Sequence, residues 1–308
     1  MTSQAEMVDQ EATDMIMDVC KSHNSYPMWT VTDKVSKLVP NPRAVPTIWR
    51  WKEMRKIMMD SAGMVPEEMA ERRALMMVNP GFLLPHETAP AHRHMAYAVR
   101  LILESNKGFT SVAGHRIYLN PGDLVLTPSW QWHYHGNDGD IPTFWVDCLD
   151  IPLHLYARVN FLELYPTPKV PDLPVTGSPF HFPWTEAQKA LNSQDTAHAV
   201  YHYLTNGNHF SKTIAAQAER IKKGHVISLP RETVSFIYIV QSGRGSTKIR
   251  APTGEKTISW EPKDVFIVPA WSWVEHHAGD DDDAYLTALT DRALHENLGL
   301  LRTSYAET

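Results

Sequence analysis

The chain has 308 residues, which is enough for about two domains with well-buried cores. Its formal net charge of -6 and the absence of a Lys/Arg-rich run exclude the electrostatic footprint of a nucleic-acid binder. No stretch approaches the ~20 apolar residues needed to cross a bilayer, and the N-terminus lacks the basic and apolar regions of a secretory signal. We therefore expect a cytoplasmic protein without nucleic-acid or membrane partners.

The first segment, residues 1–77, has the apolar spacing of helices, as in Trp51, Met54 and Met58, and is predicted to be an N-terminal helical extension. Its Met-rich face is interpreted as packing and carries no chemistry. The two cysteines, Cys20 and Cys148, are too far apart in the sequence for a metal-binding pair, so we expect reduced thiols.

Short β-rich runs separated by Gly and Pro turns begin at about residue 78 and predict a small antiparallel barrel or sandwich over residues 78–160. Residues 161–205 form a proline-rich connector with a short helix near 184–191. β texture then returns, and residues 206–308 are predicted to be a second barrel with a C-terminal helical tail. The fold class is mainly β.

The second β module repeats the first. A slide of 141 residues without a gap superimposes Asp123, Pro128, Trp130 and Trp132 on Asp264, Pro269, Trp271 and Trp273, with apolar residues between them. The sequence therefore predicts two copies of one β-barrel. Because Trp130 and Trp132 recur, we interpret them as core residues.

Three histidines of the first copy have the pattern of a metal site. His92 and His94 are two apart on a predicted strand, so both imidazoles point to the same face. His133, further along, can supply a third neutral nitrogen ligand and leave other positions open for substrate and oxygen. A His-x-His pair alone is more often structural than chemical.

The repeat serves as an internal control for these histidines. At the 141-residue offset, His92, His94 and His133 correspond to Thr233, Ser235 and Val274. The second barrel keeps the scaffold residues and none of the proposed ligands. This difference predicts chemistry in the first barrel and no metal in the second.

Two further side chains share the faces of the proposed ligands. An unbroken strand from His92 directs Arg100 into the same interior, where a buried guanidinium needs a partner. That partner is either a substrate carboxylate or a protein carboxylate such as Asp147. His135 lies on the face of His133. It suits either a hydrogen bond to a ligand oxygen with an acid-base role, or the orientation of a metal ligand.

These motifs resemble those of the gentisate 1,2-dioxygenases, a group of cupins. The first-barrel residues that carry the resemblance are the runs APAHRH (89–94), NPGD (120–123) and TPSWQWHYHGN (127–137), with Arg100. Outside that barrel, the runs WRW (49–51) and VPAWSW (268–273) are similar too. General cupins usually carry a Glu a few residues after His-x-His, whereas positions 95–99 have none, as in the gentisate group.

The resemblance covers roughly residues 45–302 and implies a bicupin fold, a homotetramer and Fe(II) held by His92, His94 and His133. The implied reaction inserts both atoms of O2 into gentisate to give maleylpyruvate, with Arg100, His135 and Asp147 in the substrate pocket. Salicylate and 1-hydroxy-2-naphthoate dioxygenases share these motifs, so the ring substrate stays open. A metal-dependent isomerase or decarboxylase and a non-catalytic bicupin binding protein are the alternatives from other classes.

Overall fold

The computed structural model describes residues 10–22, 37, 39–40, 42–60 and 77–305, in two compact units, Met1–Asn41 and Pro42–Thr308. In the first unit, α1 (Gln10–Ser22) is an amphipathic helix with Met15 and Val19 exposed. Among the described helices, none has the length and apolarity to cross a membrane.

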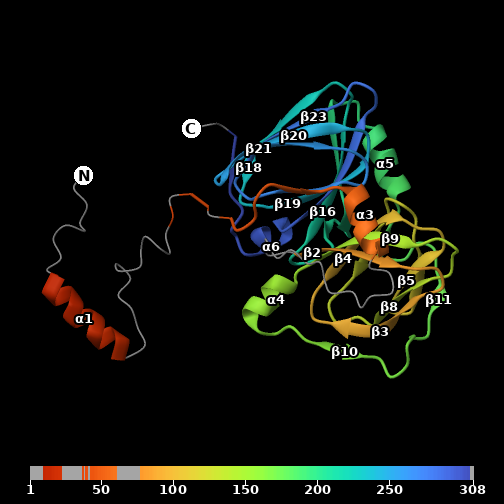
Figure 1. Cartoon of the computed structure of the whole chain (residues 1–308), viewed down its shortest axis with the longest axis horizontal. Coiled ribbons are helices and arrows are strands. Elements are labelled where there is room, and N and C mark those ends of the chain that lie inside the picture. The colour runs from red at the N-terminus through yellow and green to blue at the C-terminus, as the bar shows by residue number, and fades with distance from the viewer. Residues whose placement is uncertain (1–9, 23–36, 38, 41, 61–76, 306–308) are drawn as a thin grey trace. The chain divides into compact units, whose positions relative to one another are not determined.

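The first barrel consists of two sheets (Figure 1). One sheet has the order β12-β7-β4-β9-β2 and the other β10-β3-β8-β5-β6-β11. The strands before the connector are β2 (Met77–Leu83), β3 (Thr88–His94), β4 (Ala98–Glu104), β5 (Gly108–Val112), β6 (His115–Tyr118), β7 (Leu124–Thr127), β8 (His133–Asn137) and β9 (Thr143–Leu149).

The connector contributes strands to this barrel as well as helices. Helix α4 (Ile151–Ala157) precedes it, and its own elements include β10 (Leu162–Leu164), β11 (Leu173–Pro174), β12 (His181–Phe182) and α5 (Trp184–Asn192). The predicted short helix near 184–191 is α5. β10 and β11 extend the sheet that holds β3 and β8, while β12 extends the opposite sheet.

The second barrel has sheets of order β1-β22-β19-β24-β16-β13 and β17-β23-β20-β21. Its elements are β13 (His198–His202), β14 (Leu204–Thr205), β15 (Asn208–His209), β16 (Ala215–Ile221), β17 (Val226–Leu229), β18 (Arg231–Glu232), β19 (Phe236–Ser242), β20 (Gly245–Ala251), β21 (Gly254–Trp260), β22 (Val265–Val268), β23 (Trp273–Ala278), β24 (Ala284–Thr290), α6 (Arg292–Asn297) and β25 (Thr303–Ser304). The mainly β prediction with two related modules is confirmed.

The repeat is visible in the backbone. β7 and β22 begin at Leu124 and Val265, which are equivalent at the predicted 141-residue offset. Trp130 and Trp271, equivalent at the same offset, both adopt the uncommon left-handed conformation, with φ of 64° and 60°. The two copies therefore share turn geometry as well as strand order.

Each barrel binds a strand and the start of a helix that lead into the other barrel. The second barrel binds the segment before the first barrel, and the first barrel binds the segment before the second. β1 (Thr47–Trp49) pairs with β22 of the second barrel, and Asp264 accepts the backbone N–H of Trp51, the first residue of α3 (Trp51–Asp60), at 2.9 Å. Reciprocally, β12 pairs with β7, and Asp123 accepts the N–H of Trp184 at the start of α5 at 2.9 Å. These carboxylates satisfy N–H groups that helix starts leave unpaired.

One hydrophobic core runs through both barrels. It joins Leu101 and Phe144 of the first barrel to Ile239 of the second, and includes Trp51 and Met58 from α3. Packing is the role predicted for Met58, whereas much of the predicted extension, including residues 61–76, lies outside the described residues. Residues 47–60 are thus built into the second barrel and the shared core.

Candidate metal centre

The three candidate ligands meet on neighbouring strands. β3 and β8 are antiparallel, and His92 lies directly opposite His133. The imidazole ring centre of His133 lies 4.3 Å from that of His92 and 4.8 Å from that of His94. One ring nitrogen from each histidine lies within 4.8 Å of the others, and among the described residues this is the group of three that could hold a metal ion.

A backbone carbonyl fixes the tautomer of each ring. His92 Nδ1 is 2.8 Å from Pro90 O, His94 Nδ1 is 2.8 Å from Ala96 O, and His133 Nδ1 is 2.8 Å from Gln131 O. A carbonyl oxygen only accepts hydrogen bonds, so every Nδ1 carries the proton and every Nε2 keeps a lone pair. Three equivalent Nε2 lone pairs are the donor set that a first-row divalent metal takes from imidazoles.

The surroundings keep these ligands neutral. Burial lowers the pKa of His94, and it lowers the pKa of His133 well below its ordinary value, with a further contribution from the neighbouring His92. A protonated imidazole cannot bind a metal, so the lowered pKa values leave these two ligands available at neutral pH. The residues present therefore fit a metal ion.

Arg100 and Asp147 lie side by side on β4 and β9 and form a bidentate ion pair. Arg100 Nε donates to Asp147 Oδ1 at 2.8 Å, and Nη2 donates to Oδ2 at 2.9 Å. The guanidinium lies 4.6 Å from the Trp145 ring centre, and Trp145 Nε1 donates to Asp147 Oδ2 at 2.8 Å. The protein carboxylate that the sequence left open as a partner thus occupies the fork of Arg100.

The remaining edge of Arg100 faces His135. Arg100 Nη1 lies 2.5 Å from His135 Nδ1 and 3.0 Å from Thr110 Oγ1. Burial and the positive charge of Arg100 lower the pKa of His135 well below its ordinary value, so the ring is neutral. His135 lies beside the ligand group, with its ring centre 5.6 Å from that of His133.

Sequence reasoning missed two members of this polar network, Trp145 and Thr110. Trp145 is two residues before Asp147 on β9, so strand parity places both on one face and was the available signal. Thr110 lies opposite His135 on paired strands, a register that only the structure supplies. Together the two residues hold the Arg100–Asp147 pair and His135 in fixed orientations.

The second barrel corrects two predictions. Trp130 and Trp132 are half-buried instead of core residues, and they stack on Arg93, as Trp271 and Trp273 stack on Arg231. Arg93 and Arg231 are 138 residues apart, so the equivalents of His92 and His94 are Pro230 and Glu232, and the ungapped assignment to Thr233 and Ser235 is wrong. The offset changes because hairpin β20–β21 is longer than β5–β6.

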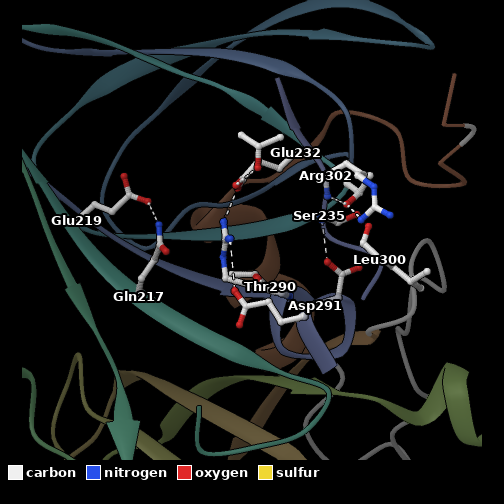
Figure 2. Close-up of polar contacts among 12 residues, drawn as sticks. Gln217, Glu219, Glu232, Ser235, Thr290, Asp291, Leu300 and Arg302 are labelled. Atoms are coloured by element: carbon white, nitrogen blue, oxygen red, sulfur yellow. Dashed lines mark hydrogen bonds and ion pairs between the residues drawn. The ribbon is translucent and has the colours of Figure 1, made fainter. Parts of the chain in front are cut away.

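No histidine stands at these corrected positions. Trp130 N donates to His94 O and Trp271 N to Glu232 O, which supports the same correspondence. Arg292 Nη2 and Thr303 Oγ1 donate hydrogen bonds to the Glu232 carboxylate, and Figure 2 shows Glu232 among the polar contacts of this barrel. By contrast, His276 is equivalent to His135 and bonds Thr247 as His135 bonds Thr110.

Comparison with known proteins identifies the family. The cupin domain family matches residues 82–151. The chain is 30% identical to gentisate 1,2-dioxygenase 1 of Aquipseudomonas alcaligenes over 92% of this chain and 94% of that protein. It is 31% identical to 5-aminosalicylate 1,2-dioxygenase of a Comamonas species over 91% of this chain and 86% of that protein.

A solved structure supports the fold. Salicylate 1,2-dioxygenase from Pseudaminobacter salicylatoxidans matches with a TM-score of 0.84 at 24% identity, over 96% of this chain and 99% of that one. The relatives that cover nearly the whole chain are dioxygenases, which sets aside the isomerase, decarboxylase and binding-protein alternatives. The chain belongs to the gentisate 1,2-dioxygenase family of cupins and is a ring-cleaving dioxygenase.

Proposed function

We propose that this enzyme is an Fe(II)-dependent dioxygenase that cleaves gentisate with O2 to give maleylpyruvate. The observation that carries the proposal is the convergence of three imidazoles, His92, His94 and His133, whose Nδ1 atoms are all bound by carbonyls. The proposed metal is iron because imidazole ligation suits Fe(II) and the family inserts O2. Bound Fe(II) would supply a Lewis acid at which an anionic aromatic substrate and O2 meet.

The proposed role of the protein around the metal is positional. Neutral ligands leave the full charge of a divalent ion in place, which favours a substrate with adjacent carboxylate and hydroxyl groups. Arg100 adds a second positive charge next to this site, and we assign it the attraction of the substrate carboxylate. Because Asp147 occupies Nε and Nη2, and Thr110 and His135 face Nη1, the carboxylate would have to displace one of these partners to bind the guanidinium.

His135 is proposed to orient the substrate hydroxyl or O2. Arg100 Nη1 lies 2.5 Å from His135 Nδ1 and 3.1 Å from Nε2, so the neutral ring accepts at the nearer Nδ1 and carries its proton on Nε2. This arrangement supports hydrogen-bond donation and argues against an imidazolium acid in the resting enzyme. Asp147 then acts through Arg100, as the carboxylate that holds the guanidinium in place.

Oxygen-electrode turnover after anaerobic Fe(II) reconstitution tests the substrate. We expect the highest kcat/KM with gentisate, against salicylate, 5-aminosalicylate and 1-hydroxy-2-naphthoate. The Comamonas relative named for 5-aminosalicylate makes that compound the second candidate. Greater kcat/KM with any of the other three would overturn gentisate as the substrate. No oxygen uptake with all four compounds would refute the proposed substrate class.

We also propose a cytoplasmic homo-oligomer, a tetramer by likeness to the family. A run of exposed apolar side chains on α4, β10 and the connector supports self-association, because apolar patches of this kind mark interaction surfaces. The run consists of Leu155, Tyr156, Val159, Phe161, Leu162, Leu164 and Leu173. Light scattering on the Leu162→Glu/Leu164→Glu double variant should give a smaller assembly than the wild type, and an unchanged mass would exclude this surface.

A further inference from the structure

Arg93 stands between two proposed metal ligands but points away from them. Side chains alternate along β3, so Arg93 lies on the face opposite His92 and His94. On that face its guanidinium lies 4.5 Å from the ring centres of both Trp130 and Trp132. Trp132 immediately precedes His133 in the chain. One side chain thus links the strand of two ligands to the segment that leads into the third.

The stack is enclosed on both sides and anchored. Trp130 contacts Phe161 with ring centres 4.7 Å apart, and Trp132 contacts Tyr165 at 5.0 Å. Arg93 Nε and Nη2 donate to Glu163 Oε2 at 2.9 and 2.6 Å. Glu163 lies opposite Arg93 on the paired strand β10. A planar guanidinium that stacks and donates at the same time is held in one orientation.

The backbone of this segment is held against β3 at the same place. Trp130 N donates to His94 O at 2.9 Å, and Ser129 Oγ donates to Met95 O at 2.6 Å. Trp130 keeps a left-handed backbone conformation, with φ of 64°, which is costly for an aromatic residue and persists only where other contacts impose it. The stacking of Trp130 on Arg93 is such a contact.

The second barrel has the same Arg–Trp stack but no histidines at the positions of the proposed ligands. Arg231 stacks between Trp271 at 4.8 Å and Trp273 at 5.1 Å, and Trp271 is also left-handed. Within the described part of the chain, the buried Arg231 Nε has no hydrogen-bond partner, so the carboxylate that Glu163 gives Arg93 has no counterpart at that atom. The stacking of an arginine between two tryptophans therefore belongs to the barrel fold. The first barrel, which has the proposed metal ligands, adds the Glu163 carboxylate bound to Arg93.

We propose that Arg93 is a positioning residue for the three-histidine centre. Stacked between Trp130 and Trp132 and anchored by Glu163, it sets the spacing between the His92/His94 strand and His133, and so the affinity and geometry of the metal. This inference rests on the proposed metal site. It requires no contact between Arg93 and the metal or the substrate.

The test compares Arg93→Met with Arg231→Met, which removes the equivalent stack in the second barrel. Metal-stripped protein is titrated with Co(II) against a chelator, its visible spectrum reports ligand geometry, and Tm reports stability. Arg93→Met should bind Co(II) about 10- to 100-fold more weakly, the range for residues that orient metal ligands, with an altered spectrum. Arg231→Met should lower Tm comparably and leave Co(II) affinity and spectrum unchanged.

Other outcomes are decisive as well. An unchanged affinity and spectrum in Arg93→Met, or an equal loss of affinity in both variants, overturns the proposal. If wild type and His133→Ala bind Co(II) alike, the metal site itself is wrong. If Arg93→Met does not fold, Arg93→Lys and Glu163→Gln replace it. Both should bind Co(II) more weakly than wild type. Lysine cannot stack and donate two hydrogen bonds at once, and Glu163→Gln removes the carboxylate that accepts them. Wild-type affinity in both would overturn the proposal.

Discussion

Arg100 and Asp147 face each other across β4 and β9, with both carboxylate oxygens taken by one guanidinium. This pair makes the role of Arg100 testable. Arg100→Met keeps the apolar stem and removes the charge, so kcat/KM should fall by roughly 30- to several-thousand-fold, or about 2–5 kcal/mol. Arg100→Lys should recover little because an ammonium cannot reproduce the fork. Steady-state oxygen uptake with iron content measures both.

Asp147→Asn separates substrate attraction from positioning. If Asp147 only holds Arg100, the variant keeps the Arg100 charge and should lose less kcat/KM than Arg100→Met. Near-normal kcat/KM in Arg100→Met would make the pair structural and place the carboxylate anchor elsewhere. Iron content is the control, because neither residue belongs to the three-histidine group.

The asymmetry of the barrels predicts one metal per chain. Metal analysis of stripped and reloaded protein should give about one equivalent, since Pro230, Glu232 and Val274 stand where the second barrel would need ligands. His133→Ala should lose both metal and activity, whereas His276→Ala should keep the stoichiometry while losing stability, because His276 is fully buried. Two equivalents in the wild type would contradict the asymmetric site.

Buried groups of the second barrel predict acid sensitivity. Burial would raise the pKa of Glu219, but hydrogen bonds from His198 and Gln217 lower it from 4.5 to about 2. Burial lowers the pKa of His276 from 6.5 to about 4. The unfolded chain takes up both protons at higher pH, so stability falls as pH drops from 6.5 to about 4 through His276, and from 4.5 to about 2 through Glu219.

Urea unfolding as a function of pH checks this acid sensitivity. Glu219→Gln removes the carboxylate, shown with Gln217 in Figure 2, and should flatten the lower window. His276→Gln should flatten the upper window. Stability that is constant between pH 6.5 and about 4 in the wild type would contradict the His276 assignment.

The reciprocal caps predict which segment each aspartate holds. Asp264→Ala should lower the free energy of unfolding by roughly 1–3 kcal/mol, as for lost helix caps and buried hydrogen bonds, and should increase hydrogen exchange at β1 and α3. Asp123→Ala should cost a similar amount and increase exchange at β12 and α5. Equal exchange changes at all four elements would mean that the caps act only through global stability.

The sequence predicted the repeat and the three histidines because strand parity and a fixed offset are local properties of the chain. Parity also found Arg100, but it could not choose its partner, since Asp147 and a substrate carboxylate offer a guanidinium the same chemistry. The ungapped slide failed before Asp264 because the offset between the two copies changes from 138 to 141 residues across the longer hairpin β20–β21. The pairing of β1 with β22 could not be predicted from the sequence, since no local pattern encodes a partner so distant along the chain.

The exchange of helices between barrels also constrains when the chain can finish folding. Arg50 binds Asp264, which lies 214 positions later, and β1 pairs with β22, so β1 and Arg50 lack these partners until β22 has left the ribosome. At 5–20 residues per second, that interval is roughly 10–40 s. Helix α3 can contact the first barrel earlier, through Arg55 and Glu104. The first barrel can close on its own β12 and α5 soon after they emerge, whereas β1 can dock only after β22 has been synthesised.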